Sequence, residues 1–302
     1  MMRILLLLLT SLFFTQLLAQ DAPPNTNVYL FNLSKGTESL TLTEPRFLTR
    51  FNQYGYNNQP RFIGNSSLLL TVQIPGDTQT DLYLLNLKDR IKTRFTATYE
   101  SEYSPQIISG AMGKGTKGST RVSCIRVATD DNATQYLWEY PLDRSNQGKA
   151  ILDDLTGIGY YAWSGMNKLA LFVVGEPHTL VVANLLTGDQ ITVTSDIGRC
   201  LQRFPNGDVA FVQMIDDKTW LLKRLNMATY QPELVTAMLE GVEDFVLLND
   251  GTVIIGKGSK LYKFNRNVDI SWKEVADLSS YGIRNITRMA VSSDGSQLAI
   301  VN

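Results

Sequence analysis

This chain of 302 residues has very little histidine and cysteine, two side chains on which many enzymes depend. It contains a single histidine, His178, so a multi-histidine metal site and the H-E-x-x-H zinc motif are both excluded. No G-x-S-x-G motif is present, and any serine or cysteine nucleophile would have to use that one histidine. The net charge is −1, so the chain has no cationic excess to hold a nucleic acid, and we expect no nucleic-acid partner.

One glycine-rich stretch, Gly110 to Gly118, superficially resembles a phosphate-binding loop. It lacks the G-K-[ST] sequence at the required spacing, and the residues that follow, Thr120 to Val127, have the pattern of a strand rather than a helix. We therefore expect a long hairpin here and no nucleotide site.

What the sequence does contain is one strand pattern that returns six times. The copies align on Val28, Leu82, Leu137, Leu180, Trp220 and Leu261, at intervals of 54, 55, 43, 40 and 41 residues. A period near 40 residues built from short strands is typical of a β-propeller, with one four-stranded sheet in each blade. Tight turns such as Asn249-Asp250-Gly251 separate the strands, and no long amphipathic helix is evident, which indicates an all-β fold.

The two ends of the chain each supply half of a blade. Ile286–Val291 and Leu298–Val301 form one half, and Val28–Leu33 with Ser39–Thr43 form the other. Because an open ring would expose two unpaired strand edges, we expect the N-terminal strands to complete the last blade. The prediction is a six-bladed β-propeller with four-stranded antiparallel blades, a single domain over residues 20–302.

Short motifs in the first complete blade carry a family resemblance. Gln59-Pro-Arg-Phe is followed by Asp81-Leu-Tyr, Arg94-Phe-Thr and Tyr103-Ser-Pro. This order resembles the repeat of TolB-like propellers, the WD40-like (PD40) family of secreted bacterial proteins. The last turn, Ser292-Ser293-Asp294-Gly295, is similar to the turn of that repeat except at its proline. The resemblance implies the fold; the family includes accessory proteins, protein-binding modules and non-catalytic domains of peptidases.

Residues 1–19 have the pattern of a signal peptide. Arg3 precedes a short apolar region, and Leu17-Leu18-Ala19 provides a cleavage site before Gln20. The alternative is an uncleaved anchor helix, but an interrupted apolar stretch of about 15 residues is short for ~30 Å of hydrocarbon. We expect a periplasmic or extracellular protein, a monomer without stable membrane insertion after cleavage.

Two cysteines raise the question of a disulfide, because a secreted chain matures in an oxidising compartment. Cys124 falls in the second strand of blade 2 and Cys200 in the first strand of blade 4. Non-neighbouring blades rarely bring two Cα atoms within ~7 Å, so we expect two free, buried thiols.

The connections that start each new blade are rich in Tyr, Asn, Glu and Arg, and in a propeller these connections line the opening of the ring. Convergent polar groups in a concavity are the usual sign of a ligand site. We expect the binding surface to contain Tyr103, Tyr160, Tyr161, Arg199, Asp244 and Arg288. The alternative is that these residues only join neighbouring blades, as an Arg199–Glu243 ion pair would.

These features favour a secreted, non-catalytic binding propeller that recognises a protein, a peptide or an envelope glycan. One alternative is a metal-dependent lactonase or esterase, as in other six-bladed propellers, and another is a structural module of an envelope complex. No cofactor is expected; if Ca²⁺ binds, its oxygen ligands would come from Asn58, Glu102, Asp244 and Asn285. If Arg199 and Arg288 lie at the same depth in the channel as these ligands, their positive charges would disfavour the binding of a cation there.

Overall fold

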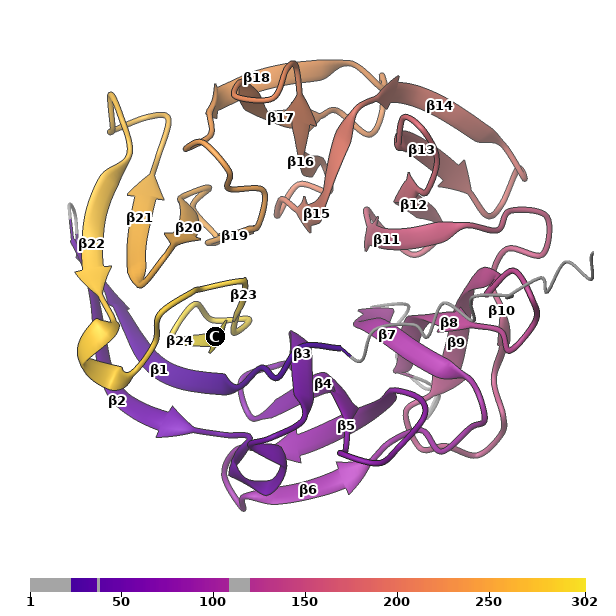
Figure 1. Cartoon of the computed structure of the whole chain (residues 1–302). Coiled ribbons are helices and arrows are strands. Elements are labelled where there is room, and N and C mark those ends of the chain that lie inside the picture. The colour runs from indigo at the N-terminus through magenta and orange to yellow at the C-terminus, as the bar shows by residue number, and fades with distance from the viewer. Residues whose placement is uncertain (1–22, 37–38, 109–119) are drawn as a thin grey trace, which may run out of the picture.

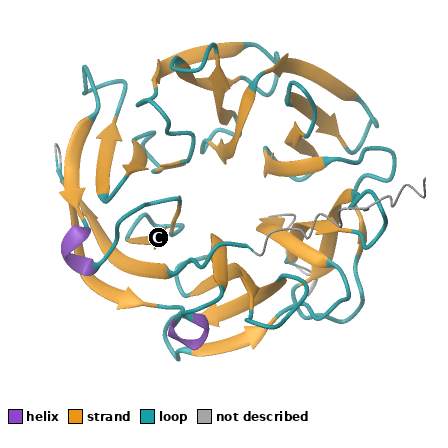
Figure 2. Cartoon of the chain, in the orientation of Figure 1, coloured by secondary structure: helices purple, strands orange, loops and turns teal. Residues whose placement is uncertain are grey.

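A computed structural model describes residues 23–36, 39–108 and 120–302. Six four-stranded antiparallel sheets form a ring, with β3, β7, β11, β15, β19 and β23 innermost (Figure 1). The only helices in the described ranges are two single 3-10 turns, η1 (Arg50–Asn52) and η2 (Ser279–Tyr281), and the remainder is strand and loop (Figure 2). The predicted six-bladed propeller is confirmed.

The blades are numbered along the chain from the first complete sheet. Blade 1 consists of β3 (Tyr56–Ile63), β4 (Ser67–Gln73), β5 (Asp81–Asn86) and β6 (Ile91–Arg94). Blade 2 consists of β7 (Ser101–Ile108), β8 (Arg121–Val127), β9 (Gln135–Pro141) and β10 (Lys149–Ala150). Blade 3 consists of β11 (Ile158–Trp163), β12 (Lys168–Val173), β13 (Thr179–Asn184) and β14 (Gln190–Ser195).

Blade 4 consists of β15 (Ile197–Arg203), β16 (Val209–Met214), β17 (Trp220–Leu225) and β18 (Pro232–Ala237). Blade 5 consists of β19 (Phe245–Leu247), β20 (Val253–Lys257), β21 (Lys260–Phe264) and β22 (Lys273–Asp277). Blade 6 combines β23 (Arg288–Val291) and β24 (Gln297–Val301) with β1 (Val28–Lys35) and β2 (Leu40–Phe47).

Blade 6 is closed by the N-terminal strands, as predicted. β1 runs antiparallel to β24 with Val28 opposite Val301, and β2 pairs with the other edge of β1. The backbones of Asn27 and Asn302 exchange two hydrogen bonds of 2.9 Å just beyond the paired strands. The first and the last strand of the described residues are thus held in one sheet, and neither β1 nor β24 presents an open edge.

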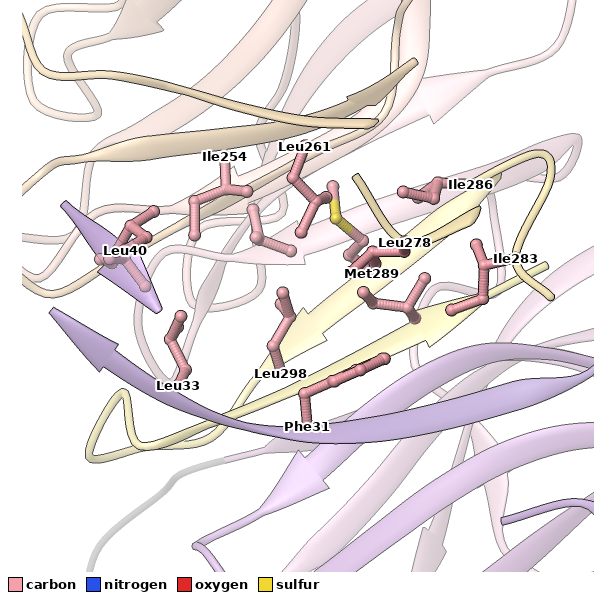
Figure 3. Packing of buried hydrophobic residues seen from close by; sticks show 13 residues of the cluster. Phe31, Leu33, Leu40, Ile254, Leu261, Leu278, Ile283, Ile286, Met289 and Leu298 are labelled. Carbon is pink, nitrogen blue, oxygen red and sulfur yellow. The ribbon is translucent and has the colours of Figure 1, made fainter. Parts of the chain in front are cut away.

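The apolar core lies between neighbouring blades. Alternate residues of the strands point into these layers, as in the contacts of Phe31 and Leu298 of blade 6 with Ile254 and Leu261 of blade 5 (Figure 3). These side chains are at most 1% exposed. Burying one such side chain stabilises the fold by about 1.5–3 kcal/mol, so each pair of blades supports its neighbours.

Several strands differ in their bounds from the sequence prediction. The outer strand of blade 1 ends at Arg94, within the Arg94-Phe-Thr motif, because the Thr96 hydroxyl accepts a hydrogen bond from the Leu82 N–H (2.8 Å) in place of a ladder bond. Ser39–Thr43 is the longer β2, which continues to Phe47 past a register shift. Ile286–Val291 is shortened to Arg288–Val291, since Ile286 instead bonds to the Gly258 carbonyl.

Both cysteines are free and buried, as predicted, with Cys124 in β8 and Cys200 in β15. Burial raises the pKa of Cys200 to about 12 and raises that of Cys124 as well. His178 stands before β13, where its Nδ1 accepts a hydrogen bond from the Gly175 N–H at 3.2 Å. The predicted signal peptide, residues 1–19, and the Gly110–Gly118 stretch lie outside the described residues.

Candidate functional site

The innermost strands of blades 1 to 4 each contain a register shift where they line the centre of the ring. In blades 1 and 2 the shift occurs at Gln59 (φ 52°) and Ser104 (φ 53°), each followed by a proline. Proline has no N–H to give to the ladder, so the bulge places it where none is needed. The Gln-Pro and Ser-Pro motifs of the sequence are therefore the sites at which these strands bend.

The two bulges are joined through one side chain. The Gln59 amide oxygen accepts hydrogen bonds from the Ser104 N–H and from the Thr71 hydroxyl, both at 2.8 Å. Because Gln59 and Thr71 belong to blade 1 and Ser104 to blade 2, this contact fixes the relative position of the two blades at the channel.

A small cavity of about 90 Å³ lies at the centre of the ring, lined by the innermost segments of all six blades. Five of the six residues predicted for the binding surface line it: Tyr160, Tyr161, Arg199, Asp244 and Arg288. Tyr103 is outside this lining. We use the term channel mouth for Tyr56, Tyr160, Arg199, Asp244 and Arg288, the residues that stand near the starts of their innermost strands.

An ionic network spans blades 4, 5 and 6 at the channel mouth. The Asp244 carboxylate lies 2.6 Å from Arg199 and 3.1 Å from Arg288, and Arg199 also pairs with Glu243 at 3.1 Å. Burial lowers the pKa of Arg288, but the Asp244 carboxylate together with Tyr160, Cys200 and Tyr56 outweighs this effect and raises it. Both guanidinium groups therefore stay charged, and the blade-joining Arg199–Glu243 contact weighed from the sequence is present.

Tyr160 faces this network from across the ring. Its hydroxyl accepts a hydrogen bond from an Arg288 nitrogen at 3.1 Å, and the Arg288 guanidinium carbon lies 5.1 Å from the centre of its ring. The contact is a cation–π interaction that holds the phenol at the opening.

Tyr161 occupies different surroundings from its neighbour. It is 2% exposed, and its hydroxyl lies 3.0 Å from both the Ser104 carbonyl and the Ser123 hydroxyl. Its ring belongs to the apolar cluster between blades 2 and 3. We correct the expectation that the Tyr161 side chain faces a ligand, because its hydroxyl is already hydrogen-bonded to Ser104 and Ser123 inside the fold.

Two residues of the site were missed from the sequence. Burial raises the pKa of Tyr56 to about 12, and Arg288, Tyr160, Tyr103 and Arg199 are near enough to perturb it, so Tyr56 belongs with these aromatic groups. Arg61 lines the cavity lower in the channel. Arg61 lies in the Gln59-Pro-Arg-Phe motif and Tyr56 in the connection that starts blade 1, so their position in the repeat was the available signal.

Arg61 has an unusual electrostatic environment. Burial lowers its pKa, and the nearest ionisable groups are Tyr161 and Arg203. Among the described residues no carboxylate pairs with it. The cavity lining thus contains three arginines, Arg61, Arg199 and Arg288, and one acid, Asp244.

Two buried polar atoms at the cavity have no hydrogen-bond partner among the described residues. They are the Ser104 hydroxyl oxygen and Arg199 Nε. An unsatisfied buried polar group in a folded protein calls for an explanation, and a bound ligand or water supplies one. Both atoms belong to residues that line the cavity.

The four oxygen donors considered for Ca²⁺ do not form one site. Glu102 is fully buried in β7 of blade 2, where the hydroxyls of Thr96, Thr98 and Tyr140 donate hydrogen bonds to its carboxyl, and burial raises its pKa to about 7. Asp244 is occupied by two arginines, and no contact joins Asn58 or Asn285 to either acid. In the described ranges no group of three His, Cys, Asp or Glu residues could hold a metal ion.

In the part of the chain that the structure covers, no helix is both long and apolar enough to cross a bilayer.

Comparison with known proteins relates the chain to propellers at the level of structure. No family model and no curated protein matches the sequence. The putative TolB of Agrobacterium tumefaciens superposes with a TM-score of 0.64 at 12% identity, covering 92% of this chain and 98% of the other. TolB of Acinetobacter baumannii gives 0.53 at 11% identity, covering 94% and 66%. An oligogalacturonate lyase of Vibrio parahaemolyticus gives 0.50 at 14% identity, covering 92% and 98%. The chain therefore shares the six-bladed propeller fold of the TolB proteins.

Proposed function

We propose that this protein is a non-catalytic binding propeller of the periplasm, and that it recognises a protein or peptide partner at the channel mouth. The observation that carries the proposal is the gathering of Tyr160, Arg199 and Arg288 around one cavity, with Tyr56 close to them and two unsatisfied buried polar atoms on residues of the lining. Tyrosine and arginine are the usual anchors of protein interfaces, because each combines a large contact face with polar groups.

The charge of the channel favours an acidic group on the partner. Three arginines and one aspartate line the cavity, and Arg61 has no carboxylate of its own. A guanidinium binds a carboxylate through paired, charge-assisted hydrogen bonds, which are stronger where water is excluded. An Asp or Glu side chain, or a chain terminus, satisfies this requirement.

The size of the cavity favours a protein over a glycan. Pockets that enclose a small-molecule ligand measure about 300–1,000 Å³. The cavity here, about 90 Å³, admits one side chain and leaves the body of the partner on the surrounding face. A glycan whose rings lie across the tyrosines without entering is the alternative ligand.

Hydrolysis is the weaker assignment for this site. The lactonase-like alternative requires several oxygen ligands around one cation, and the candidate donors Glu102 and Asp244 are held in separate hydrogen-bond networks. The oligogalacturonate lyase has a similar fold, and a fold alone does not carry an activity.

The proposed periplasmic location rests on the signal-like residues 1–19 together with the TolB-like fold.

The test is capture from a native cell-envelope extract on the immobilised mature chain, with identification by mass spectrometry and a parallel glycan array. Retention of a defined protein at near-equal stoichiometry supports the proposal. Binding on the glycan array without a retained protein would replace it with the glycan alternative. Retention of a fixed set of several proteins would favour a structural module of a larger complex.

A further inference from the structure

A second and larger hollow lies on the outer rim, away from the channel. It measures about 680 Å³ and is bounded by the end of β2 and η1 on one side and by the β5–β6 hairpin on the other. Figure 1 shows these elements side by side where blade 6 meets blade 1. We call it the rim groove, defined by Arg46, Phe47, Arg50, Phe51, Arg90 and Lys92 with the leucines beneath them.

The rim groove is strongly cationic. Arg46, Arg50, Arg90 and Lys92 line it, and no Asp or Glu does. None of the four forms an ion pair within the described ranges. Of the two acids of this hairpin, Asp89 in the turn accepts a hydrogen bond from the Asn86 amide at 3.0 Å, and Asp81 at the far end pairs with Arg94. A chain with a net charge of −1 therefore concentrates four unpaired cations in one concavity.

Aromatic rings position two of these cations. The Arg50 guanidinium carbon lies 5.8 Å from the centre of the Phe47 ring, and Lys92 Nζ lies 5.0 Å from that of Phe51. The rings are themselves braced, Phe47 against Tyr29 at 5.1 Å and Phe51 against Tyr83 at 5.9 Å. Cation–π contacts leave the N–H groups at the edge of a cation able to bind an anion.

The floor of the groove is apolar and firmly packed. Leu85 and Leu87 line it and are 6% and 7% exposed, as part of the core cluster between blades 6 and 1. Ile91, at the start of β6, is 59% exposed beside them. An occupant therefore meets positive charge at the walls and aliphatic carbon below.

We propose that the rim groove binds a short acidic peptide segment of a partner protein, with carboxylates on the four cations and an apolar side chain against the leucines. Charge complementarity selects an acidic segment, because the four cations of the groove would repel a basic one. A volume of about 680 Å³ suits several side chains of one segment. A flat membrane surface does not fit as well, because lipid headgroups would contact the cations while the recessed leucines stayed uncovered.

The probe is a fluorescein-labelled eight-residue peptide of alternating Glu and Leu, titrated with the mature chain and followed by fluorescence anisotropy. We expect saturable binding that weakens with salt, and a loss of at least about tenfold in the double variant Arg50→Glu with Lys92→Glu. The matched control is Arg284→Glu with Lys257→Glu, which makes the same charge change at two exposed residues outside the groove and should bind as the parent does.

Three results would overturn the proposal. These are an equal loss in both double variants, equally tight binding of a Lys–Leu peptide, and binding to vesicles rich in anionic lipid without binding to the Glu–Leu peptide. If the Arg50→Glu double variant does not fold, Arg90→Gln with Lys92→Gln replaces it, since both side chains are exposed, and we expect a several-fold loss. The channel mouth shares no residue with this groove, so either site can fail without the other.

Discussion

Arg288 of blade 6 donates a hydrogen bond of 3.1 Å to the Asp244 carboxylate of blade 5, and Arg199 of blade 4 binds the other oxygen of the same carboxylate at 2.6 Å. One acid thus joins three blades at the opening of the channel. Its two partners are not equivalent, because the Arg288 side chain is 15% exposed and that of Arg199 is 36% exposed.

This difference predicts unequal costs of mutation. Asp244→Ala should lower the free energy of unfolding by about 3 kcal/mol, because it leaves the buried Arg288 charge without its carboxylate. Arg199→Ala should cost about 1 kcal/mol or less, since Asp244 keeps Arg288 and the lost pair is partly solvated. Urea denaturation of both variants measures the two values, and equal losses would contradict the asymmetry.

The closure of blade 6 predicts that the ring depends on its N-terminus. Deleting residues 21–47 removes β1 and β2 and exposes the edge of β24, so the protein should aggregate or melt at a much lower temperature. Deleting residues 21–24 is the control, because the described hydrogen bonds of the N-terminal segment begin at Asn25. A monomeric 21–47 deletion that melts within a few degrees of the parent would refute the closure.

Glu102 predicts a dependence of stability on pH. Its pKa is raised from 4.5 to about 7, so the folded protein holds a proton that the unfolded chain releases between these values. Stability should therefore fall as the pH rises from about 4.5 to 7, by on the order of 3 kcal/mol, and level off above. Urea denaturation at pH 5 and at pH 8 tests whether the free energy of unfolding is lower at the higher pH. Glu102→Gln should flatten the difference, whereas Glu274→Gln, in an exposed pair with Lys260, should not. A wild type equally stable at both values would contradict it.

The two cysteines predict a simple chemical count. Thiol titration in denaturant without reductant should find two groups per chain, and the native protein should react slowly because burial raises the pKa of both thiols. A mass lower by two hydrogens, or a melting temperature that reductant changes, would show a disulfide instead.

The fold was predictable from the sequence because each blade repeats one local pattern, and the sum of six copies is more specific than any single one. The half-blades at the two ends, such as Val28–Leu33 and Leu298–Val301, were sufficient to predict that β1 pairs with β24 and closes the ring. Strand ends were less predictable. At Thr96 a side-chain hydroxyl ends the ladder of β6, and no periodicity signals such a bond.

The site was predictable only as a location. The start of each innermost strand falls at the ring opening, which correctly brought Tyr160, Arg199, Asp244 and Arg288 together. The direction of each side chain depends on the bulges, because a register shift of one residue moves the following side chains to the opposite face of the sheet. The register shift between Ile158 and Tyr160 precedes both tyrosines and sets the faces of the residues that follow, and the alternation of the strand then places Tyr160 at the mouth and Tyr161 on the buried side.

The most direct test of the central claim is the affinity of the captured partner for two variants matched in stability. Arg199→Ala removes a half-exposed cation from the channel mouth, and Arg121→Ala removes one of similar exposure, 39%, from the outer part of blade 2. Asp244 then keeps Arg288 and Glu139 keeps Lys149 as a second basic partner, while the exposed-side acid Glu243 keeps its hydrogen bond from the backbone N–H of residue 199. Isothermal titration should give at least about tenfold weaker binding for Arg199→Ala and parental binding for Arg121→Ala. Parental affinity in Arg199→Ala, or an equal loss in both, would contradict recognition at the channel mouth.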